Sequence, residues 1–322
     1  MATAQITVSH PLATPNGSQP SSTEAPTISL LGPNATAASV RLDVSAPFSA
    51  IRTLFDHLYS HPDDATNLNA IYPRRGILKT AATIKTSSDQ KFTIDLSPKR
   101  VALIPASLQQ SLAGHGLKDV LDFFNTLTTE YVPSILSTLS ILAGADFTPA
   151  HSTYNMNFRL CDYNPVTAAS GSLNGCGAHT DYGTFTIIFQ DGTPGLELED
   201  ASAPGSWVPV PGDATVVLTG WCAVILSGGR IAAARHRVRR TPGVRRLSAV
   251  LFIAPDLDVT LRPLGGIQPI RPFSETVMRG DIDTGVFKEV MGKRWRYREG
   301  NEEMEGHEIG TQDDEIAKLI WA

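Results

Sequence analysis

The spacing of apolar residues separates a helical half of the chain from a strand-rich half. Between residues 39 and 150 apolar residues recur at helical spacing, in PFSAIRTLFDHLY (47–59) and in a long run over 117–144, where Pro133 should interrupt the helix. Between 151 and 300 they recur at every second position in short runs such as YNMNFRL, TFTIIF and RRLSAVLFIA. Alternate side chains of a strand point to opposite faces, so this pattern predicts a sandwich or barrel of short strands, with the helices packed on it.

The two ends of the chain differ from both halves. Residues 1–38 are rich in Ser, Thr, Pro, Asn and Ala, too polar for a packed element, which predicts a flexible N-terminal arm. Residues 301–322 are acidic and return to helical character. We therefore expect an arm, a helical region over 39–150, a strand-rich core over 151–300 and an acidic C-terminal tail or helix.

Composition and charge narrow the class of partner. The chain has 322 residues, 42% of them hydrophobic, which is enough for a substantial core. Its 27 basic and 32 acidic side chains give a formal net charge of −5, so the charge does not suggest binding to nucleic acid or to an anionic membrane. We expect a small-molecule partner, and a monomer or a weak homo-oligomer.

The cysteines and the apolar runs bear on location. Cys161, Cys176 and Cys222 are odd in number and lack CxxC spacing, which favours reduced thiols over a disulfide framework. The opening MATAQITVSH does not resemble a signal peptide, and no apolar run approaches the roughly 18 residues that span a bilayer. The expected location is cytoplasmic, without a membrane partner.

A histidine and an aspartate stand two positions apart in HTDYGTFTIIF. If this stretch is a strand, His179 and Asp181 project from one face and could hold a common metal ion. Taken alone, the pair is explained equally well by a surface histidine beside a solvated aspartate.

A third ligand would make the pair specific, because Fe(II) oxygen chemistry uses two histidines and one carboxylate on one face of the metal. His236 lies in the strand pattern RIAAARHRV, 55 residues after Asp181, far enough for the chain to pass round a barrel and return. The alternative is an ordinary core or surface histidine flanked by arginines. The other histidines lie outside the predicted strands: His10, His57, His61, His115, His151 and His307.

An arginine enters the strand pattern ten residues further on, in RRLSAV. Arg246 and Ser248 share a face by the period-two rule, and an arginine inside a barrel is costly unless it meets an anion. Guanidinium matches a carboxylate with two parallel hydrogen bonds, and the serine hydroxyl can add a third. The alternative is that Arg246 belongs to a basic surface run, RHRVRRTPGVRR.

Together His179, Asp181, His236, Arg246 and Ser248 resemble the signature of Fe(II)- and 2-oxoglutarate-dependent dioxygenases of the isopenicillin N synthase-like family. The resemblance extends to DQKFTIDLSPKR, RLCDYNP, PGLEL, GDATVVLTG and FKEVMGKRWRYREG, and so spans roughly residues 72 to 300. It implies a double-stranded β-helix, or jelly-roll, with flanking helices. The aromatic-glycine-phenylalanine stretch that precedes the first helix in family members is missing, which suggests a shortened amino-terminal region.

The resemblance also implies roles for individual residues. His179, Asp181 and His236 would bind Fe(II), 2-oxoglutarate would chelate the iron, and its far carboxylate would bind Arg246, Ser248 and Tyr163. Many members have asparagine two positions before that tyrosine and proline directly after it, whereas this chain has Cys161 and Asn164.

The implied activity is oxidation of a C–H bond with Fe(II), 2-oxoglutarate and O2. Segments resembling RLCDYNP and KRWRYREGN occur in fungal enzymes that tailor aromatic polyketides, often at an aryl methyl group, so a small secondary metabolite is the expected substrate. Hydroxylation and further oxidation both fit. Two alternatives remain: an iron oxidase of the same fold that does not use 2-oxoglutarate, and a non-catalytic jelly-roll binding protein.

Strand parity extends the site towards the substrate. If Tyr163 faces the barrel interior, Arg159 and Asn157 on the same strand face it too, Arg159 about 13 Å from Tyr163. We expect Arg159 and Asn157 to contact the substrate, with Arg159 meeting a phenolate, carboxylate or carbonyl. The alternative is a structural ion pair of Arg159 with Asp162 or with a helix carboxylate.

Overall fold

The computed structural model describes residues 45–71, 90–153, 155–168, 172–201, 203–294 and 312–322, together with the backbone of four short strands within 5–9, 27–31, 38–41 and 78–79.

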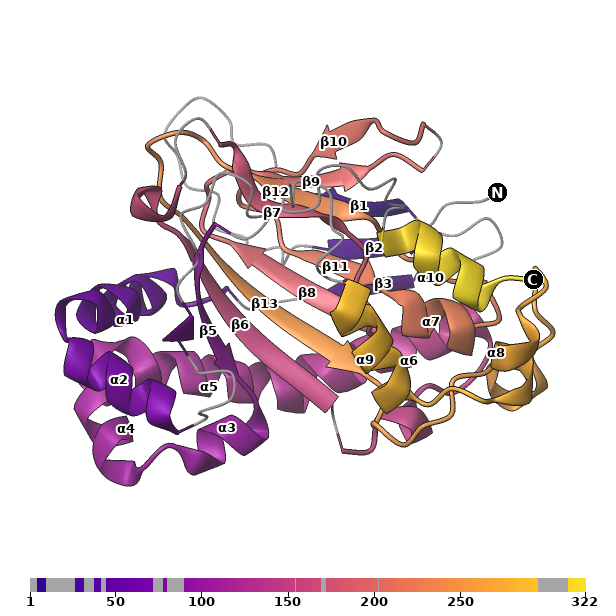
Figure 1. The fold of residues 1–322 in the computed structure, drawn as a ribbon, viewed down its shortest axis with the longest axis horizontal. Coiled ribbons are helices and arrows are strands. Elements are labelled where there is room, and N and C mark those ends of the chain that lie inside the picture. The colour runs from indigo at the N-terminus through magenta and orange to yellow at the C-terminus, as the bar shows by residue number, and fades with distance from the viewer. Residues whose placement is uncertain are drawn as a thin grey trace.

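Two antiparallel sheets form the centre of the molecule and face one another (Figure 1). The larger sheet has the strand order β11-β8-β13-β6-β5-β4, and the smaller one has the order β10-β9-β12-β7. This arrangement, with helices outside, is the predicted jelly-roll. The strands of the larger sheet are β4 (Leu78–Lys79), β5 (Phe92–Leu96), β6 (Asn155–Tyr163), β8 (Phe185–Gln190), β11 (Val216–Thr219) and β13 (Arg246–Ala254). Those of the smaller sheet are β7 (Asn174–His179), β9 (Leu196–Glu199), β10 (Trp207–Pro209) and β12 (His236–Arg239).

The larger sheet is buried on both faces. Along β6, Phe158 and Leu160 belong to the apolar layer shared with the helices, and the ring of Phe124 stacks on Phe158 with centroids 5.2 Å apart. The alternate residues Cys161 and Tyr163 belong to a second apolar layer between the two sheets. Period two therefore separates a supporting face of β6 from an inner face that is available to a ligand.

Among the described residues six α-helices precede β6, and Figure 1 shows them gathered along one side of the larger sheet. The predicted helix over 47–59 is α1. The helices are α1 (Phe48–Ser60), α2 (Pro62–Ala70), α3 (Pro98–Leu103), α4 (Ala106–Leu112), α5 (Lys118–Thr126) and α6 (Val132–Ala143).

The predicted interruption at Pro133 takes the form of a π-helical turn over Leu127–Tyr131. The N–H of Val132 donates to the Leu127 carbonyl, five residues back, which widens the turn just before the proline. Pro133 then falls at the start of α6, where its missing N–H costs little. The long helical run ends at Gly144, which adopts the left-handed conformation typical of a helix terminus.

The C-terminal part returns to helix, as the sequence predicts. It contains α8 (Glu275–Arg279), α9 (Thr284–Arg294) and α10 (Gln312–Ile320), while α7 (Trp221–Leu226) is inserted between β11 and β12. The end of the chain is fixed by Trp321, whose ring stacks on Phe273 with centroids 4.6 Å apart.

Some expectations differ from the structure or lie outside the described residues. The strands β1 (Gln5–Ser9), β2 (Thr27–Leu31) and β3 (Ala38–Arg41) form a small sheet that the polar composition of the first 38 residues did not predict. The strands β4 and β5 lie in a region predicted to be helical. The rest of the predicted arm with His10, the segment 295–300 and His307 lie outside the described residues.

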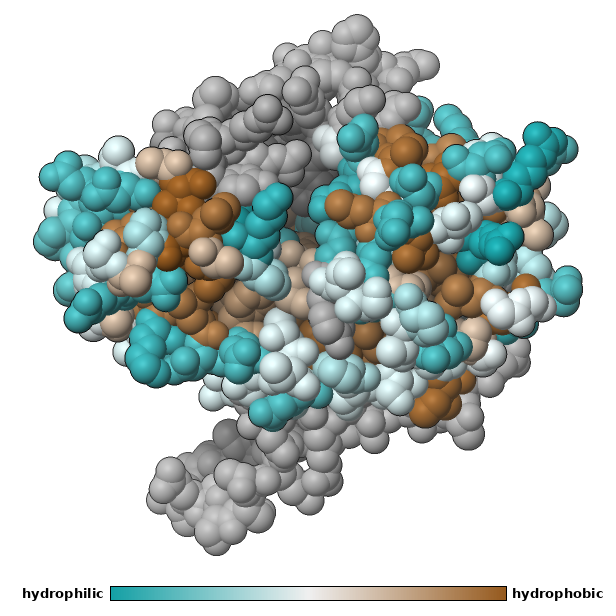
Figure 2. All heavy atoms as spheres, turned by 90° about the horizontal axis from the view of Figure 1, so that it is seen from below, coloured by the Kyte–Doolittle hydropathy of each residue, from teal (hydrophilic) through white to brown (hydrophobic). Residues whose placement is uncertain are grey.

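The surface carries scattered apolar side chains. On the face in Figure 2, polar side chains surround strips of apolar ones. The exposed apolar residues Ile141, on α6, and Leu257, in a turn after β13, belong to different parts of the chain. Among the helices that the structure describes, none is both long and apolar enough to cross a membrane.

Candidate functional site

His179 and His236 lie directly opposite one another in the smaller sheet. His179 is the last residue of β7, His236 is the first of β12, and the two are register partners in this antiparallel pair. Their ring centroids are 4.4 Å apart, and both side chains are buried. The chain thus returns beside its starting strand, as the spacing of 55 residues from Asp181 suggested.

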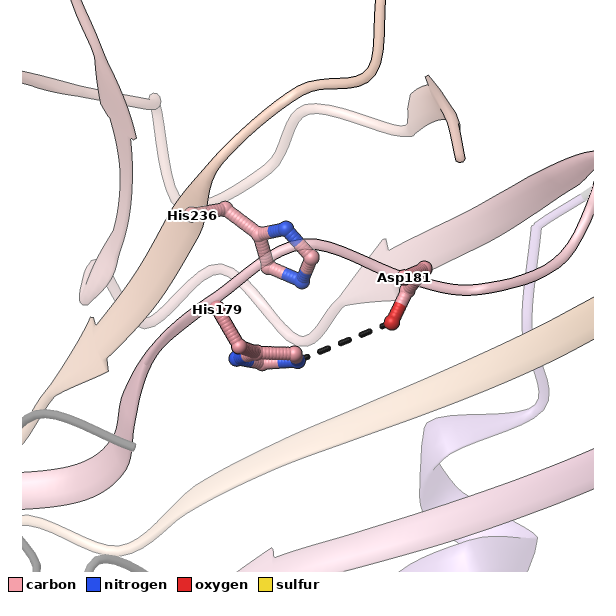
Figure 3. Close-up of side chains that lie close together, drawn as sticks. All are labelled: His179, Asp181 and His236. Carbon is pink, nitrogen blue, oxygen red and sulfur yellow. Dashed lines mark ion pairs between the residues drawn. The ribbon is translucent and has the colours of Figure 1, made fainter. Parts of the chain in front are cut away.

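Asp181 lies beyond the end of β7, so the expectation that one strand carries both members of the pair is wrong. The loop that holds it packs against α7: the Asp181 carbonyl accepts a hydrogen bond from the Trp221 N–H at 3.0 Å. Gly220 permits this approach, because a Cβ there would lie 2.5 Å from the same carbonyl oxygen. The Asp181 carboxylate still turns towards His179, with Oδ1 3.6 Å from Nε2 (Figure 3).

Backbone carbonyls set the protonation of both imidazoles. Nδ1 of His179 donates to the Gly177 carbonyl at 2.8 Å, and Nδ1 of His236 donates to the Ala234 carbonyl at 3.1 Å. A carbonyl can only accept, so Nδ1 carries a proton in each ring, and Nε2 is the atom left to bind a metal. Oδ2 of Asp181 accepts a 2.6 Å hydrogen bond from the Thr186 hydroxyl, which orients the carboxylate.

The ligand atoms of His179, Asp181 and His236 all lie within 4.8 Å of one another, and all three residues are buried. Burial alone would raise the pKa of Asp181, but His179, His236 and the Thr186 hydroxyl hold that pKa below its ordinary 3.8, so the carboxylate is ionised. Two imidazoles and one carboxylate from a buried site fit non-haem Fe(II). Among the described residues, this is the one cluster of this kind.

The remaining described histidines have other surroundings. His151 is buried and bonds through Nδ1 to the Phe147 carbonyl and through Nε2 to the Thr184 hydroxyl, each at 2.7 Å. His57 stacks between His61 and His115, with ring centroids 4.0 and 3.8 Å apart. Of the described histidines, His236 is therefore the one that completes the candidate metal site with His179 and Asp181.

A cavity between the two sheets joins this cluster to the predicted anion site. Its lining contains His179 and His236 together with Tyr163, Arg246 and Ser248, and it encloses about 490 Å³ including the space at its mouth. Arg246 pairs with Tyr163 across β13 and β6, and Ser248 pairs with Cys161. The prediction that Arg246 and Ser248 share an inward face is confirmed.

The Arg246 guanidinium is buried and only partly satisfied by the protein. Nη2 donates to Oε1 of Gln190 at 2.9 Å and Nε donates to the Thr193 carbonyl at 3.2 Å. Nη1 is buried and has no acceptor among the described residues. A buried N–H without an acceptor is unfavourable, so the guanidinium is arranged for an anion supplied from the cavity.

The neighbouring Arg245 also forms ion pairs within the protein, so the arginines of RHRVRRTPGVRR are not simply solvated surface residues. Its guanidinium faces the helices, where it pairs with Asp162 on β6 and Asp56 on α1, each at 2.7 Å. The two adjacent arginines thus point to opposite faces of β13, as period two requires.

Two glycines make room for the anion site. Gly195 has a φ of +146°, and a Cβ there would lie 2.5 Å from the Arg239 carbonyl oxygen and 3.4 Å from Arg246 Cδ. Gly175 lies against Tyr163, whose ring atoms would be 3.0 Å from a Cβ. Burial raises the pKa of Tyr163 above its ordinary 10, so its phenol is protonated and can donate a hydrogen bond.

Arg159 lines the cavity as parity predicts, but it already has a carboxylate partner. Asp95, its register partner on β5, accepts from Arg159 Nε at 2.7 Å and from Nη2 at 3.3 Å. Asn157 is held in the same network: its Nδ2 donates to Asp95 at 2.8 Å and its Oδ1 accepts from Arg100 at 2.6 Å. The acidic neighbour is therefore Asp95, and Asp162 lies on the other face of β6.

Sequence reasoning missed the contribution of β5 to the site. Lys91 lines the cavity and Asp95 orients Arg159, and both come from the stretch KFTID. The signal was present as polar residues at every second position, namely Lys91, Thr93 and Asp95. Phe252 on β13, the other neighbour of β6, also lines the cavity, and its ring centroid is 5.5 Å from Arg159 Cζ.

Comparison with known proteins matches residues 154–255 to the 2OG-Fe(II) oxygenase superfamily. The chain is 33% identical over 133 residues to the proline hydroxylase buaE of Petromyces alliaceus, which covers 38% of this chain and 41% of that protein. It is 39% identical over 111 residues to the 2-oxoglutarate-dependent dioxygenase citB of Monascus ruber, covering 33% of each chain. The match thus spans less than half the length of these curated relatives.

A solved structure extends the likeness to most of the chain. The full-length Neurospora crassa T7H in complex with alpha-KG and thymine superposes with a TM-score of 0.59, 18% identity, and coverage of 76% of this chain and 83% of that one. At this identity the likeness concerns the fold, and it agrees with the two-sheet architecture described above.

Proposed function

We propose that this chain, a member of the 2OG-Fe(II) oxygenase superfamily, is an Fe(II)- and 2-oxoglutarate-dependent dioxygenase that oxidises a C–H bond of a small molecule. The observation that carries the proposal is one cavity with two complementary ends. At one end lie the imidazoles of His179 and His236, with the Asp181 carboxylate beside them in the same cluster. At the other end lies the buried Arg246, whose Nη1 has no acceptor among the described residues.

The donor set fits Fe(II) held by His179, Asp181 and His236, with 2-oxoglutarate lying along the cavity towards Arg246. Ser248 and Tyr163 line the cavity beside that guanidinium and supply hydroxyl donors for the far carboxylate. Bound iron, 2-oxoglutarate and O2 together supply an oxidation of a substrate C–H bond in which 2-oxoglutarate becomes succinate and CO2.

The protein's own part is to orient these groups and to keep water out. The carbonyls of Gly177 and Ala234 keep the lone pairs of the imidazoles on Nε2. The apolar inner layer, with Ile188, Val238 and Val250, surrounds the anion site and strengthens its electrostatic interactions.

The substrate contacts are proposed at the other end of β6. Arg159 lines the cavity four residues from Tyr163, and its guanidinium is aimed by Asp95 rather than neutralised from within the cavity. With Asn157 and the Phe252 ring beside it, this end suits an aromatic molecule with an acidic or carbonyl oxygen. The resemblance to fungal tailoring enzymes supports an aromatic polyketide, oxidised at an aryl methyl group.

The proposal extends to partners and location. We propose a monomer or weak homo-oligomer without nucleic acid or membrane partners, in the cytoplasm. The three cysteines are buried thiols that form no disulfide, which supports a reducing compartment.

The test is an anaerobic titration of Fe(II)-loaded protein with 2-oxoglutarate, followed by addition of O2. We expect the weak visible charge-transfer band of the chelate, and succinate once O2 is admitted. Iron binding without the band would favour an oxidase that does not use 2-oxoglutarate, and failure to bind Fe(II) would favour a non-catalytic binding protein.

A further inference from the structure

We infer that Lys91 is a second cationic ligand for the far carboxylate of the 2-oxo acid, which then binds between Lys91 and Arg246. Lys91 directly precedes β5 and is 6% exposed, while Arg246 lies on β13 and is 3% exposed. The inference rests on the proposed function, because it concerns the same cosubstrate.

Strand register places the two cations on one face. Thr93 on β5 pairs with Cys161 on β6, so Lys91, two residues earlier, stands beside Tyr163 on the same inner face. Tyr163 in turn pairs with Arg246 on β13. The lysine, the tyrosine and the arginine therefore form a row across three neighbouring strands.

The two cations lie at similar distances from the tyrosine ring. Lys91 Nζ is 5.6 Å from the centroid of the Tyr163 ring, and Arg246 Cζ is 5.1 Å from it. Both side chains line the same cavity. Lys91 Nζ also donates to the Gly175 carbonyl at 3.4 Å, a long hydrogen bond that ties the ammonium to β7 across the cavity.

The backbone that carries Lys91 is held in place. The carbonyl of Gln90 accepts from Arg240 Nη2 at 2.7 Å and from the Thr167 hydroxyl at 2.9 Å. Arg240 also donates to the Asn164 carbonyl at 2.8 Å, directly after Tyr163. This clamp fixes the start of β5 relative to the end of β6, so the ammonium is positioned before a ligand arrives.

The charge of the cavity agrees with a dianionic ligand. Its lining contains three cationic side chains, Lys91, Arg159 and Arg246, and within the described part of the chain it contains no carboxylate. Asp95 pairs with Arg159 at the far end of β6. Lys91 and Arg246 are thus two buried cationic side chains on one lining, where a carboxylate would gain charge-assisted hydrogen bonds.

The consequence is selectivity for a 2-oxo acid with an anion at its far end. The test compares two probes of equal chain length, 2-oxoglutarate and 2-oxopentanoate, which has a methyl group in place of the far carboxylate. Binding is measured by anaerobic calorimetry on protein loaded with Ni(II), so no turnover is needed. The variants are Lys91→Met and Lys91→Arg, with Lys99→Met, an exposed lysine on α3, as the matched control.

We expect Lys91→Met to weaken 2-oxoglutarate binding about tenfold or more, the loss of one charge-assisted hydrogen bond, and to leave 2-oxopentanoate binding unchanged. Lys91→Arg should retain most of the preference for 2-oxoglutarate, and Lys99→Met should behave as the wild type. Equal weakening of both acids in Lys91→Met would show a structural lysine and overturn the inference.

Two further outcomes are decisive. If Lys91→Met lacks a cooperative thermal unfolding transition, Lys91→Gln replaces it, and a full wild-type preference for 2-oxoglutarate in that variant would overturn the inference. If the wild type binds neither acid, the proposed function fails together with the inference. Weakened 2-oxoglutarate binding in Arg246→Lys but not in the Lys91 variants would overturn the inference alone.

Discussion

Arg159 and Asp95 lie directly opposite one another on β6 and β5 and are joined by two hydrogen bonds. The carboxylate is 1% exposed, whereas the arginine side chain is 24% exposed and is among the residues that line the cavity. The pair is therefore asymmetric: Asp95 is enclosed by the protein, whereas part of the Arg159 side chain is exposed. An ion pair and a substrate contact are compatible in one side chain.

Removing the arginine should uncouple the reaction. The double variant Arg159→Ala/Asp95→Asn avoids leaving a buried carboxylate without its cation, which alone would cost about 3–5 kcal/mol. We expect it to bind Fe(II) and 2-oxoglutarate normally and to form succinate slowly, but to lose product formation. Succinate and product are quantified in the same reactions.

The single variant Asp95→Asn is the control for the double variant, because Asp95→Asn keeps the Arg159 guanidinium. It should retain product formation with a raised KM for the substrate, since Arg159 is less firmly aimed. A double variant that forms product at the wild-type KM would show that Arg159 has only a structural role.

Removal of His236 should abolish activity without unfolding the protein. His236→Ala leaves one imidazole and one carboxylate, an incomplete face for Fe(II), so we expect loss of Fe(II) binding and of succinate formation. His61→Ala, which removes an exposed histidine on the helical side, should leave both unchanged. Iron retained at wild-type affinity in His236→Ala would mean that another residue completes the cluster.

A conservative change at Arg246 should affect the cosubstrate selectively. Arg246→Lys keeps the charge but loses the planar fork, so the KM for 2-oxoglutarate should rise roughly 10- to 100-fold, equivalent to about 1.5–3 kcal/mol, with Fe(II) binding intact. Arg237→Lys is the matched control, because Arg237 pairs with Glu197 outside the cavity lining. An unchanged KM in Arg246→Lys would contradict the assignment of the anion site.

His151 should make stability depend on pH. Burial lowers the pKa of His151 below the 6.5 of the unfolded chain, so the unfolded state binds the proton more readily. Its contribution to stability is therefore full above about pH 6.5 and is lost as the pH falls through that value, by at most about 1.4 kcal/mol per pH unit. Urea unfolding of metal-free wild type and His151→Gln across this range measures the difference.

At high pH the glutamine variant should be less stable by about 1–2 kcal/mol, because it loses the hydrogen bonds to Phe147 and Thr184. That deficit should shrink as the pH falls. A deficit independent of pH would mean that the pKa of His151 is the same in the folded and unfolded states.

Local patterns were sufficient for the inward-facing site residues of β6 and β13. Period two placed Arg246 and Ser248 on the inner face of β13 and Arg159 on the inner face of β6, and the register confirms each placement. Helical spacing likewise predicted α1 within one residue at each end.

Features that depend on distant partners could not be predicted in this way. Asp181 leaves the strand because its loop packs on α7, about forty residues later in the chain, an interaction that no local pattern encodes. β5 is five residues long in a helix-rich region, and its pairing with β6 joins residues more than sixty positions apart. Lys91 and Asp95 were therefore not recognised as part of the site.

On β6, Tyr163 lies beside Arg246, whereas Arg159 and Asn157, which we propose contact the substrate, lie further along the strand. In evolutionary terms, the residues proposed to bind Fe(II) and 2-oxoglutarate can change independently of those proposed to bind the substrate. Because we propose that Asn157 and Arg159 contact the substrate, a mutation at either position should change which substrates are accepted and leave the proposed ligands of Fe(II) and 2-oxoglutarate unchanged. Descendants of this chain could thus acquire new substrates by single substitutions while inheriting the same chemistry.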